Sequence, residues 1–209
     1  MFNILEKYAH LLVNYCLEVA PGDQLLVKTS AQAEPLLSHL LRAVLKAGGR
    51  MDVLWDFQGS RRILLKEGND FALDTPPPLY VKGLTEYQCF LNILAPHNLA
   101  SDNNIDPEKL KRAQKAYAPI MKTYANRTGT RDLRRSLCLY PTTANAQLAG
   151  MSLEEYEHFV FKACKLFEPD PIASWKKVGV EQQKIDDFLN AKEHIHYLGE
   201  HVALQFKTK

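Results

Sequence analysis

Three histidines near the C-terminus have the side-chain type and the spacing of metal ligands. They are His194, His196 and His201, and the pair Gly199-Glu200 that they flank favours a two-residue hairpin turn with glycine first. In such a hairpin residue 196 pairs with 203, the imidazoles share one face, and neutral imidazoles bind zinc. No other feature of the sequence supplies partners that would orient the rings, so the polar face of a half-buried hairpin is the simpler interpretation.

Two carboxylates form a second candidate for chemistry. Asp52 and Asp56 lie on one face of a strand expected over residues 51–57, and paired carboxylates can perform acid–base catalysis. A turn or capping role is the simpler interpretation here as well. The chain contains no GxSxG, GxxxxGK[ST] or GxGxxG motif. We therefore assign no catalytic, cofactor-binding or metal-ligating residue, and no cofactor, to this chain.

The cysteines are too scattered for a disulfide framework or a zinc site, which favours free thiols in a reducing cytoplasm. They are Cys16, Cys89, Cys138 and Cys164.

Basic side chains concentrate in the segment 109–135. From Glu108 to Arg135 nine Lys and Arg stand against two acidic residues, so this stretch carries +7 and the remainder −5. Such a stripe could serve a stand-alone binding module for nucleic acid or an acidic partner. No aromatic side chain is interleaved for base stacking, and a solvated helix face explains the charges more simply. We do not expect nucleic acid as a partner.

The composition is that of a globular chain. Its 209 residues are 46% hydrophobic and 24% charged, with a net charge of +2, which excludes a disordered polymer. No apolar run approaches the roughly 18–20 residues of a membrane span, and the N-terminus lacks the pattern of a signal peptide. We therefore expect a cytoplasmic protein with no membrane partner.

Apolar periodicity and turn residues predict alternating helices and strands. Strands are expected at 25–27, 51–57, 87–95 and 136–140, and helices at 2–19, 35–47, 61–66, 108–124, from Ser152 to Phe167, and 171–192. The helix after the first strand would be capped by Thr29 with Gln32. Strand–helix alternation at these lengths predicts an α/β fold with a mostly parallel sheet covered by helices.

The C-terminal stretch predicts a hairpin instead. Its alternating apolar side chains would share one face, and they are Ile195, Tyr197, Val202, Leu204 and Phe206. We expect residues 1–193 to form an α/β domain and residues 194–209 to begin a further domain.

The stretch from Leu137 to Trp175 carries a resemblance. It contains Tyr140-Pro141-Thr142, the segment Ala146–Ser152, the helix Glu154–Cys164, and Asp170-Pro171 followed by Trp175. These motifs, in this order, resemble the thermophilic-type metallo-aminopeptidases, the aminopeptidase T and aminopeptidase S group. Residues near the N-terminus also fit that family, so the resemblance runs along essentially the whole chain.

The resemblance implies an enzyme that releases N-terminal amino acids from peptides with two divalent ions, Zn, Co, Mn or Mg. Enzymes of this family are about twice as long, with their metal ligands in the second half, and no position here matches a ligand motif. We therefore expect the 209-residue chain to be inactive alone and to serve as a scaffold that shapes access to the site and dimerises the enzyme. A peptide substrate and a homo-oligomer are the partners that the resemblance implies.

Overall fold

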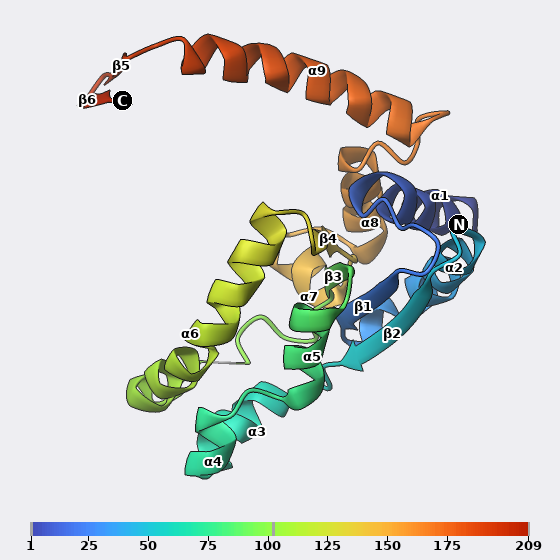
Figure 1. Cartoon of the computed structure of the whole chain (residues 1–209), viewed down its shortest axis with the longest axis vertical. Helices are drawn as coiled ribbons and strands as arrows, with labels where there is room; N and C mark the ends of the chain where they lie inside the picture. Colours follow the sequence, from blue (N-terminus) through green and yellow to red (C-terminus); the bar gives the residue numbers. More distant parts are fainter. Residues whose placement is uncertain (1, 102, 209) are drawn as a thin grey trace. The chain divides into compact units, whose positions relative to one another are not determined.

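Four parallel strands form the sheet of the first compact unit (Figure 1). The structure is a computed structural model that describes residues 2–101 and 103–208, and the chain divides into two compact units between Phe167 and Glu168. The strands are β1 (Gln24–Thr29), β2 (Arg50–Trp55), β3 (Cys89–Leu94) and β4 (Arg134–Leu139), in the order β2-β1-β3-β4. Every pairing is parallel, which confirms the predicted α/β class.

Helices cover both faces of this sheet. The helical elements of the first unit are α1 (Phe2–Leu11), the π-helical turn η1 (Leu12–Cys16), η2 (Ala31–Ala33), α2 (Glu34–Lys46), α3 (Ser60–Glu67), α4 (Asp70–Asp74), α5 (Pro78–Glu86), α6 (Pro107–Gly129), α7 (Thr143–Leu148) and α8 (Leu153–Ala163). Helices α1 and α2 lie on one side of the sheet, and α5 and α6 lie on the other (Figure 1).

Alternation along β1 sends its side chains into two apolar layers. Leu26 lies in a core with Phe90 of β3, Leu84 of α5 and Ile120 of α6. Helix α5 approaches β1 so closely that a Cβ on Gly83 would overlap the side chain of Leu26, so the absence of a side chain there sets the spacing of the layers. The neighbours Leu25 and Val27 are fully buried on the opposite face.

Most predicted helix starts are confirmed, and one cap is corrected. Asp106 caps α6, and Ser152 and Glu155 form the predicted capping box of α8. The cap after β1 is Ser30, whose hydroxyl accepts from the Gln32 amide, and not Thr29. The hydroxyl of the buried residue Thr29 instead donates to the Ile93 carbonyl of β3. The sequence patterns did not predict the short helices α4, α5 and α7.

The second unit consists of α9 (Pro171–Asn190) and an antiparallel hairpin of β5 (His194–Gly199) and β6 (Val202–Lys207). The hairpin and its apolar face are confirmed, since Ile195 pairs with Phe206 and Tyr197 with Leu204. The predicted turn is wrong by one residue: it is Glu200-His201, and Gly199 remains in the strand.

The base of the hairpin accounts for this shift. The Thr208 amide donates to the Glu193 carbonyl at 2.9 Å, and the Thr208 hydroxyl donates to the Lys192 carbonyl at 2.6 Å. These bonds fix residue 193 opposite 208, and pairing then continues in that register to the turn. Helix α9 belongs to the same compact unit as the hairpin, and the expected boundary at residue 193 stays a prediction. None of the helices in the described part of the chain is long and apolar enough to cross a membrane.

Candidate functional site

A cleft of about 1230 Å³ opens at the carboxyl ends of the parallel strands. The last residue of each strand lines it, namely Thr29, Trp55, Leu94 and Leu139. The chain runs from β1 outward to β2 and then crosses back to β3 on the other side of β1. A crevice at such a reversal of strand order is the usual ligand position in open α/β sheets.

Hydrogen bonds join the segments that leave β1 and β3 at this reversal. The Ser30 hydroxyl donates to the Ala95 carbonyl at 2.5 Å, and the Thr29 hydroxyl donates to the Ile93 carbonyl at 3.1 Å. Further along the two loops, Gln32 Nε2 lies 2.9 Å from His97 Nδ1. Since Thr29 and Ser30 are buried, their two hydrogen bonds form without solvent competition, whereas the contact between Gln32 and His97 is exposed.

Charged side chains give the cleft a positive balance. Among the residues that the structure describes, its lining includes Lys28, Arg61 and Arg62 but a single carboxylate, Asp56. Lys28 Nζ lies 2.8 Å from Asp56 Oδ2 and 6.0 Å from the centre of the Tyr80 ring. Arg62 Nη1 donates to the carbonyls of Ser101 and Asn103, both at 2.8 Å, and so attaches the loop after β3 to α3.

Aromatic and aliphatic side chains form the rest of the wall. Trp55 and Phe57 are 47% and 66% exposed, although such side chains are usually buried. Tyr80 and Tyr117 also line the cleft, and burial raises the pKa of both hydroxyls. Both tyrosines are therefore neutral hydrogen-bond donors at physiological pH.

One amide in the lining lacks a partner. Asn145 of α7 lines the cleft, and its Nδ2 atom is buried without a hydrogen bond in the part of the chain that the structure describes. Its backbone amide is used locally, since it donates to the Thr142 hydroxyl that caps α7. A buried donor without an acceptor is rare in folded proteins and calls for an explanation.

The structure does not bring the three histidines together as a metal site. His194 lies opposite Lys207, His196 lies opposite Gln205, and His201 is in the turn. Across residues 2–101 and 103–208, no group of three His, Cys, Asp or Glu side chains is arranged to hold a metal ion.

The two candidate carboxylates have separate partners. The Tyr87 hydroxyl donates to Asp52 Oδ2 at 2.8 Å, and this hydrogen bond raises the Tyr87 pKa. Asp56 lies just beyond β2 and pairs with Lys28. The two therefore form no acid–base dyad, and Asp56 alone lines the cleft.

Internal contacts use much of the basic segment 109–135. Arg112 contacts Asp70 and Asp74 on α4 at 2.6–2.7 Å. Arg127 donates to the carbonyls of Leu84 and Tyr87 at 2.7 and 2.9 Å.

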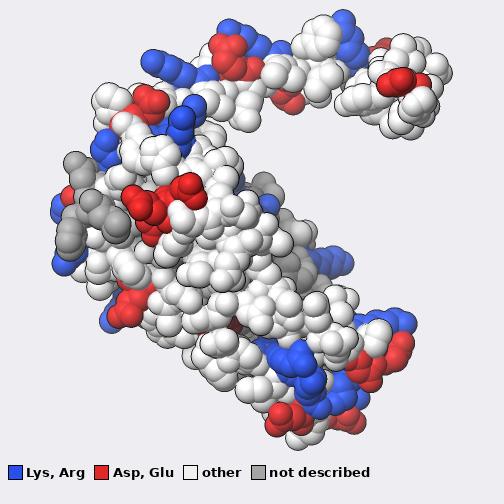
Figure 2. Space-filling model, turned by 180° about the vertical axis from the view of Figure 1, so that it is seen from behind, with Lys and Arg blue, Asp and Glu red and all other residues white. Residues whose placement is uncertain are grey.

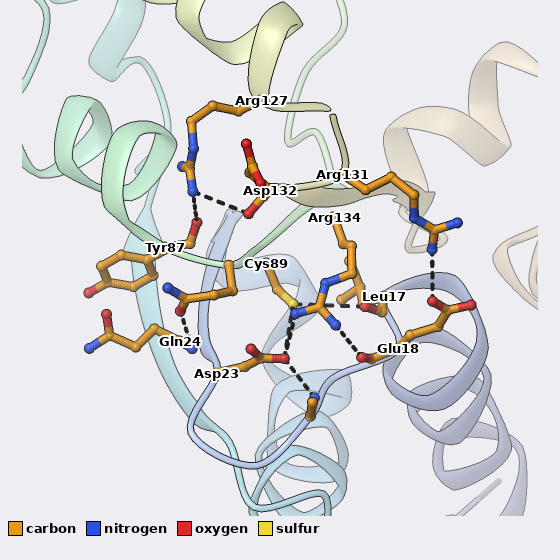
Figure 3. A network of polar contacts seen from close by, with 12 residues as sticks. Leu17, Glu18, Asp23, Gln24, Tyr87, Cys89, Arg127, Arg131, Asp132 and Arg134 are labelled. Atoms are coloured by element: carbon orange, nitrogen blue, oxygen red, sulfur yellow. Dashed lines mark hydrogen bonds and ion pairs between the residues drawn. The ribbon is translucent and has the colours of Figure 1, made fainter. Parts of the chain in front are cut away.

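The amino-terminal edge of the sheet holds two more of these arginines (Figure 3). Arg131 pairs with Glu18 at 2.7 Å, and Arg134 pairs with Asp23 at 2.6 Å. On the face drawn in Figure 2, acidic side chains lie beside basic ones and no continuous basic surface is visible. The alternative of a nucleic-acid-binding stripe therefore receives no support from these contacts.

None of the four cysteines forms a disulfide, and burial raises the pKa of each thiol. The pKa of Cys89 rises to about 11 and that of Cys138 to about 12. The thiolate is the nucleophilic form of cysteine, so these side chains lack the environment of a catalytic nucleophile.

Apart from Asp56, the sequence patterns did not single out the residues that line the cleft. Lys28 offered one signal, because it is a charged residue at the end of the buried run Leu25–Val27. Trp55, Tyr117 and Asn145 offered none, since they come together only when β2, α6 and α7 meet at one edge of the sheet.

Comparisons with known proteins agree on one family. The sequence profile of a family described as thermophilic metalloprotease (M29) matches residues 2–209. Aminopeptidase 2 of Geobacillus stearothermophilus is 26% identical over 202 residues, which cover 91% of this chain and 48% of that protein. Aminopeptidase PepS of Streptococcus thermophilus is 28% identical over 192 residues, covering 83% of this chain and 45% of the relative.

A solved structure shows the same fold. Wild-type AmpT from Thermus thermophilus superposes with a TM-score of 0.80 at 21% sequence identity, covering 99% of this chain and 53% of AmpT. The chain therefore spans about half the length of each of these proteins.

Proposed function

The chain belongs to the thermophilic metalloprotease (M29) family, and from this premise we propose that it is the N-terminal, non-catalytic domain of an aminopeptidase. The full-length enzyme would hydrolyse N-terminal amino acids from peptides. The observation that carries the proposal is the family match over residues 2–209 in a chain that spans about half the length of the aminopeptidases it resembles.

The family implies metal ions, and the side chains of this chain do not fit them. In the described residues the histidines of the hairpin are separated, and Asp23 and Asp56 are paired with Arg134 and Lys28. No step of hydrolysis is therefore assigned to the residues of this chain. Activation of water and polarisation of the scissile carbonyl, the chemistry that paired metal ions supply, belong in this proposal to the remainder of the full-length enzyme.

The exposed apolar side chains of the second unit support a scaffolding role. Tyr197, Val202 and Leu204 on the apolar face of the hairpin are 60%, 63% and 52% exposed, so the other described residues of their own unit do not cover them. A small hairpin with one bare apolar face is not stable by itself in water. We propose that this face packs against the metal-binding domain, that the chain shapes access to the active site, and that the enzyme is a cytoplasmic homodimer.

An activity assay tests the proposal. The purified chain, with its fold checked by circular dichroism, is incubated with Leu-p-nitroanilide and Co²⁺ or Zn²⁺, and no turnover is expected. A chimera that joins residues 1–209 to the part of Aminopeptidase 2 that this chain does not match is expected to release p-nitroaniline. Metal-dependent turnover that follows the 209-residue chain through purification would contradict the proposal.

A further inference from the structure

The cleft at the carboxyl edge of the sheet has the features of a small-molecule site that the proposed hydrolysis does not use. We propose that it binds a hydrophobic amino acid, free or at the end of a short peptide, through its α-carboxylate. This inference goes beyond the proposed function, because it concerns binding in this chain alone and needs neither a metal ion nor turnover.

The charge of the lining favours an anionic group. Within residues 2–101 and 103–208, the lining has the three cations Lys28, Arg61 and Arg62 against one carboxylate, Asp56. Lys28 has three N–H donors, and its ion pair with Asp56 uses one of them. The remaining donors can take a carboxylate oxygen, while Asp56 is positioned near the same ammonium to accept from an α-amino group.

Uncharged donors favour the same group. The buried Asn145 Nδ2 lacks an acceptor in the described part of the chain. The hydroxyls of Tyr80 and Tyr117 keep their protons, since burial raises the pKa of each. A ligand rich in acceptor oxygens would satisfy the Asn145 donor, whose desolvation is otherwise uncompensated.

The apolar wall of the cleft favours a ligand whose carboxylate is attached to a hydrophobic side chain. Trp55 and Phe57 from the end of β2 lie exposed in the cleft, as do Leu94, Leu99 and Met121. Apolar surface of this kind around a few convergent polar groups is the usual composition of a ligand pocket. An aliphatic or aromatic side chain would cover this surface.

The loops argue against a nucleotide, the other common ligand at this position of an α/β sheet. Nucleotide phosphates need glycines where the backbone approaches them after the first strand. The segments 30–33 after β1 and 95–106 after β3 contain no glycine. A carboxylate held by side chains does not require that approach.

The two tryptophans of the chain allow a direct test. Trp55 lines the cleft, while Trp175 is in α9 of the other unit, so Trp175→Phe leaves a single reporter at the site. This variant is titrated with L-phenylalanine and with Ala-Phe while Trp55 fluorescence is recorded. Equilibrium dialysis with radiolabelled L-phenylalanine measures binding independently of fluorescence. We expect saturable binding of at least one of the two, and phenylethylamine, which lacks the carboxylate, to bind at least tenfold more weakly.

Substitutions in the same background locate the site. Lys28→Gln is expected to weaken binding about tenfold, and Asn145→Asp to weaken it more than Asn145→Ala because it adds a negative charge. Lys82→Gln is the matched control, since Lys82 pairs with Glu86 on the exposed side of α5 and does not line the cleft. Its affinity should be unchanged.

Each outcome has a defined meaning. Binding of L-phenylalanine alone supports a free amino acid as ligand, and binding of Ala-Phe alone supports a peptide end. No saturable binding of either by dialysis, equal binding of phenylethylamine, or tighter binding of adenosine monophosphate than of both would overturn the proposal. Because the assay contains no metal and measures no hydrolysis, its failure leaves the proposed aminopeptidase function untouched, and the reverse also holds.

Discussion

The Arg134 guanidinium lies 2.6 Å from the Asp23 carboxylate and joins the start of β4 to the residue before β1, across the start of β3 (Figure 3). The two side chains are only 20% and 11% exposed. Asp23 also accepts from the Ala20 amide at 2.6 Å, and Arg134 donates to the Glu18 carbonyl at 2.5 Å. The pair therefore holds the amino-terminal edge of the sheet together.

Removing one member of this pair should be costly. Asp23→Ala leaves a largely buried guanidinium without its counter-charge, and we expect the free energy of unfolding to fall by about 3 kcal/mol. Urea denaturation measures the change. Lys184→Ala is the control, because Lys184 and Glu181 are both exposed, and it should cost about 0.5 kcal/mol or less. A loss below about 1 kcal/mol for Asp23→Ala would contradict the role assigned to the pair.

The close approach of α5 to β1 makes a second prediction. Gly83→Ala places a methyl group against Leu26, so overpacking should lower stability by about 1–3 kcal/mol. The matched control is Gly179→Ala in α9, where an added Cβ meets nothing within 4 Å. That variant should be neutral or up to about 1 kcal/mol more stable, because alanine favours helix. Thermal unfolding of both variants measures the two changes in stability. Equal changes in Gly83→Ala and Gly179→Ala would contradict the close packing of α5 against β1.

The capping box of α8 makes stability depend on acid. Hydrogen bonds from the Ser152 amide and hydroxyl to Glu155 lower the carboxyl pKa below its ordinary 4.5. A lowered pKa in the folded state stabilises the fold above pH 4.5, and this contribution is lost as the pH falls through the folded pKa. Glu155→Gln should therefore flatten the loss of thermal stability between pH 5 and pH 3, measured by circular dichroism.

Ser152→Ala should cost about 1 kcal/mol at neutral pH through the lost cap. Glu181→Gln, in an exposed pair of α9, serves as the matched control for a Glu→Gln substitution outside the capping box. If thermal stability falls equally steeply between pH 5 and pH 3 in Glu155→Gln and in the unmodified chain, the predicted contribution of Glu155 is excluded.

The raised pKa values of the cysteine thiols predict a slow reaction with thiol reagents. Burial raises the pKa of Cys89 to about 11 and that of Cys138 to about 12, and it also raises the pKa of Cys16 and Cys164. At pH 8 few thiolates are present, so the native chain should react with Ellman's reagent far more slowly than free cysteine. In guanidinium chloride all four thiols should react at once. Rapid labelling of one thiol in the native chain would contradict this prediction.

The paired arginines predict weak contact with nucleic acid. Arg112, Arg127, Arg131 and Arg134 already donate to groups of the same chain. We expect no binding of duplex DNA in fluorescence anisotropy at 20 mM salt. Binding that weakens steeply as salt is added would instead favour the basic segment 109–135 as a binding surface.

Local signals in the sequence predicted much of the fold. Asp106-Pro107, Asp170-Pro171 and the Ser152–Glu155 box each satisfy the first amides of a helix with groups within three residues, so the helix starts could be predicted without tertiary structure. The alternation of strand and helix likewise predicted a parallel sheet, because short crossovers bring the next strand back in the same direction.

The register of the hairpin and the cap after β1 depend on distant partners. Thr208 bonded to Glu193 places the turn at Glu200-His201, although Gly199 is locally the better turn residue. Thr29 does not cap the helix as expected, because its hydroxyl donates to the Ile93 carbonyl of β3. Neither partner lies within the window in which turn and cap preferences act.

The sequence by itself determined the family, the class of fold and the spacing of its elements, because those depend on neighbouring residues. Only the tertiary structure decided that β3 pairs with β1 on the side opposite β2. That strand order brings Lys28, Trp55 and Asn145 from three separate parts of the chain to one cleft. The physical reason is that strand pairing is settled by packing and hydrogen bonds between residues tens of positions apart, which no local pattern contains.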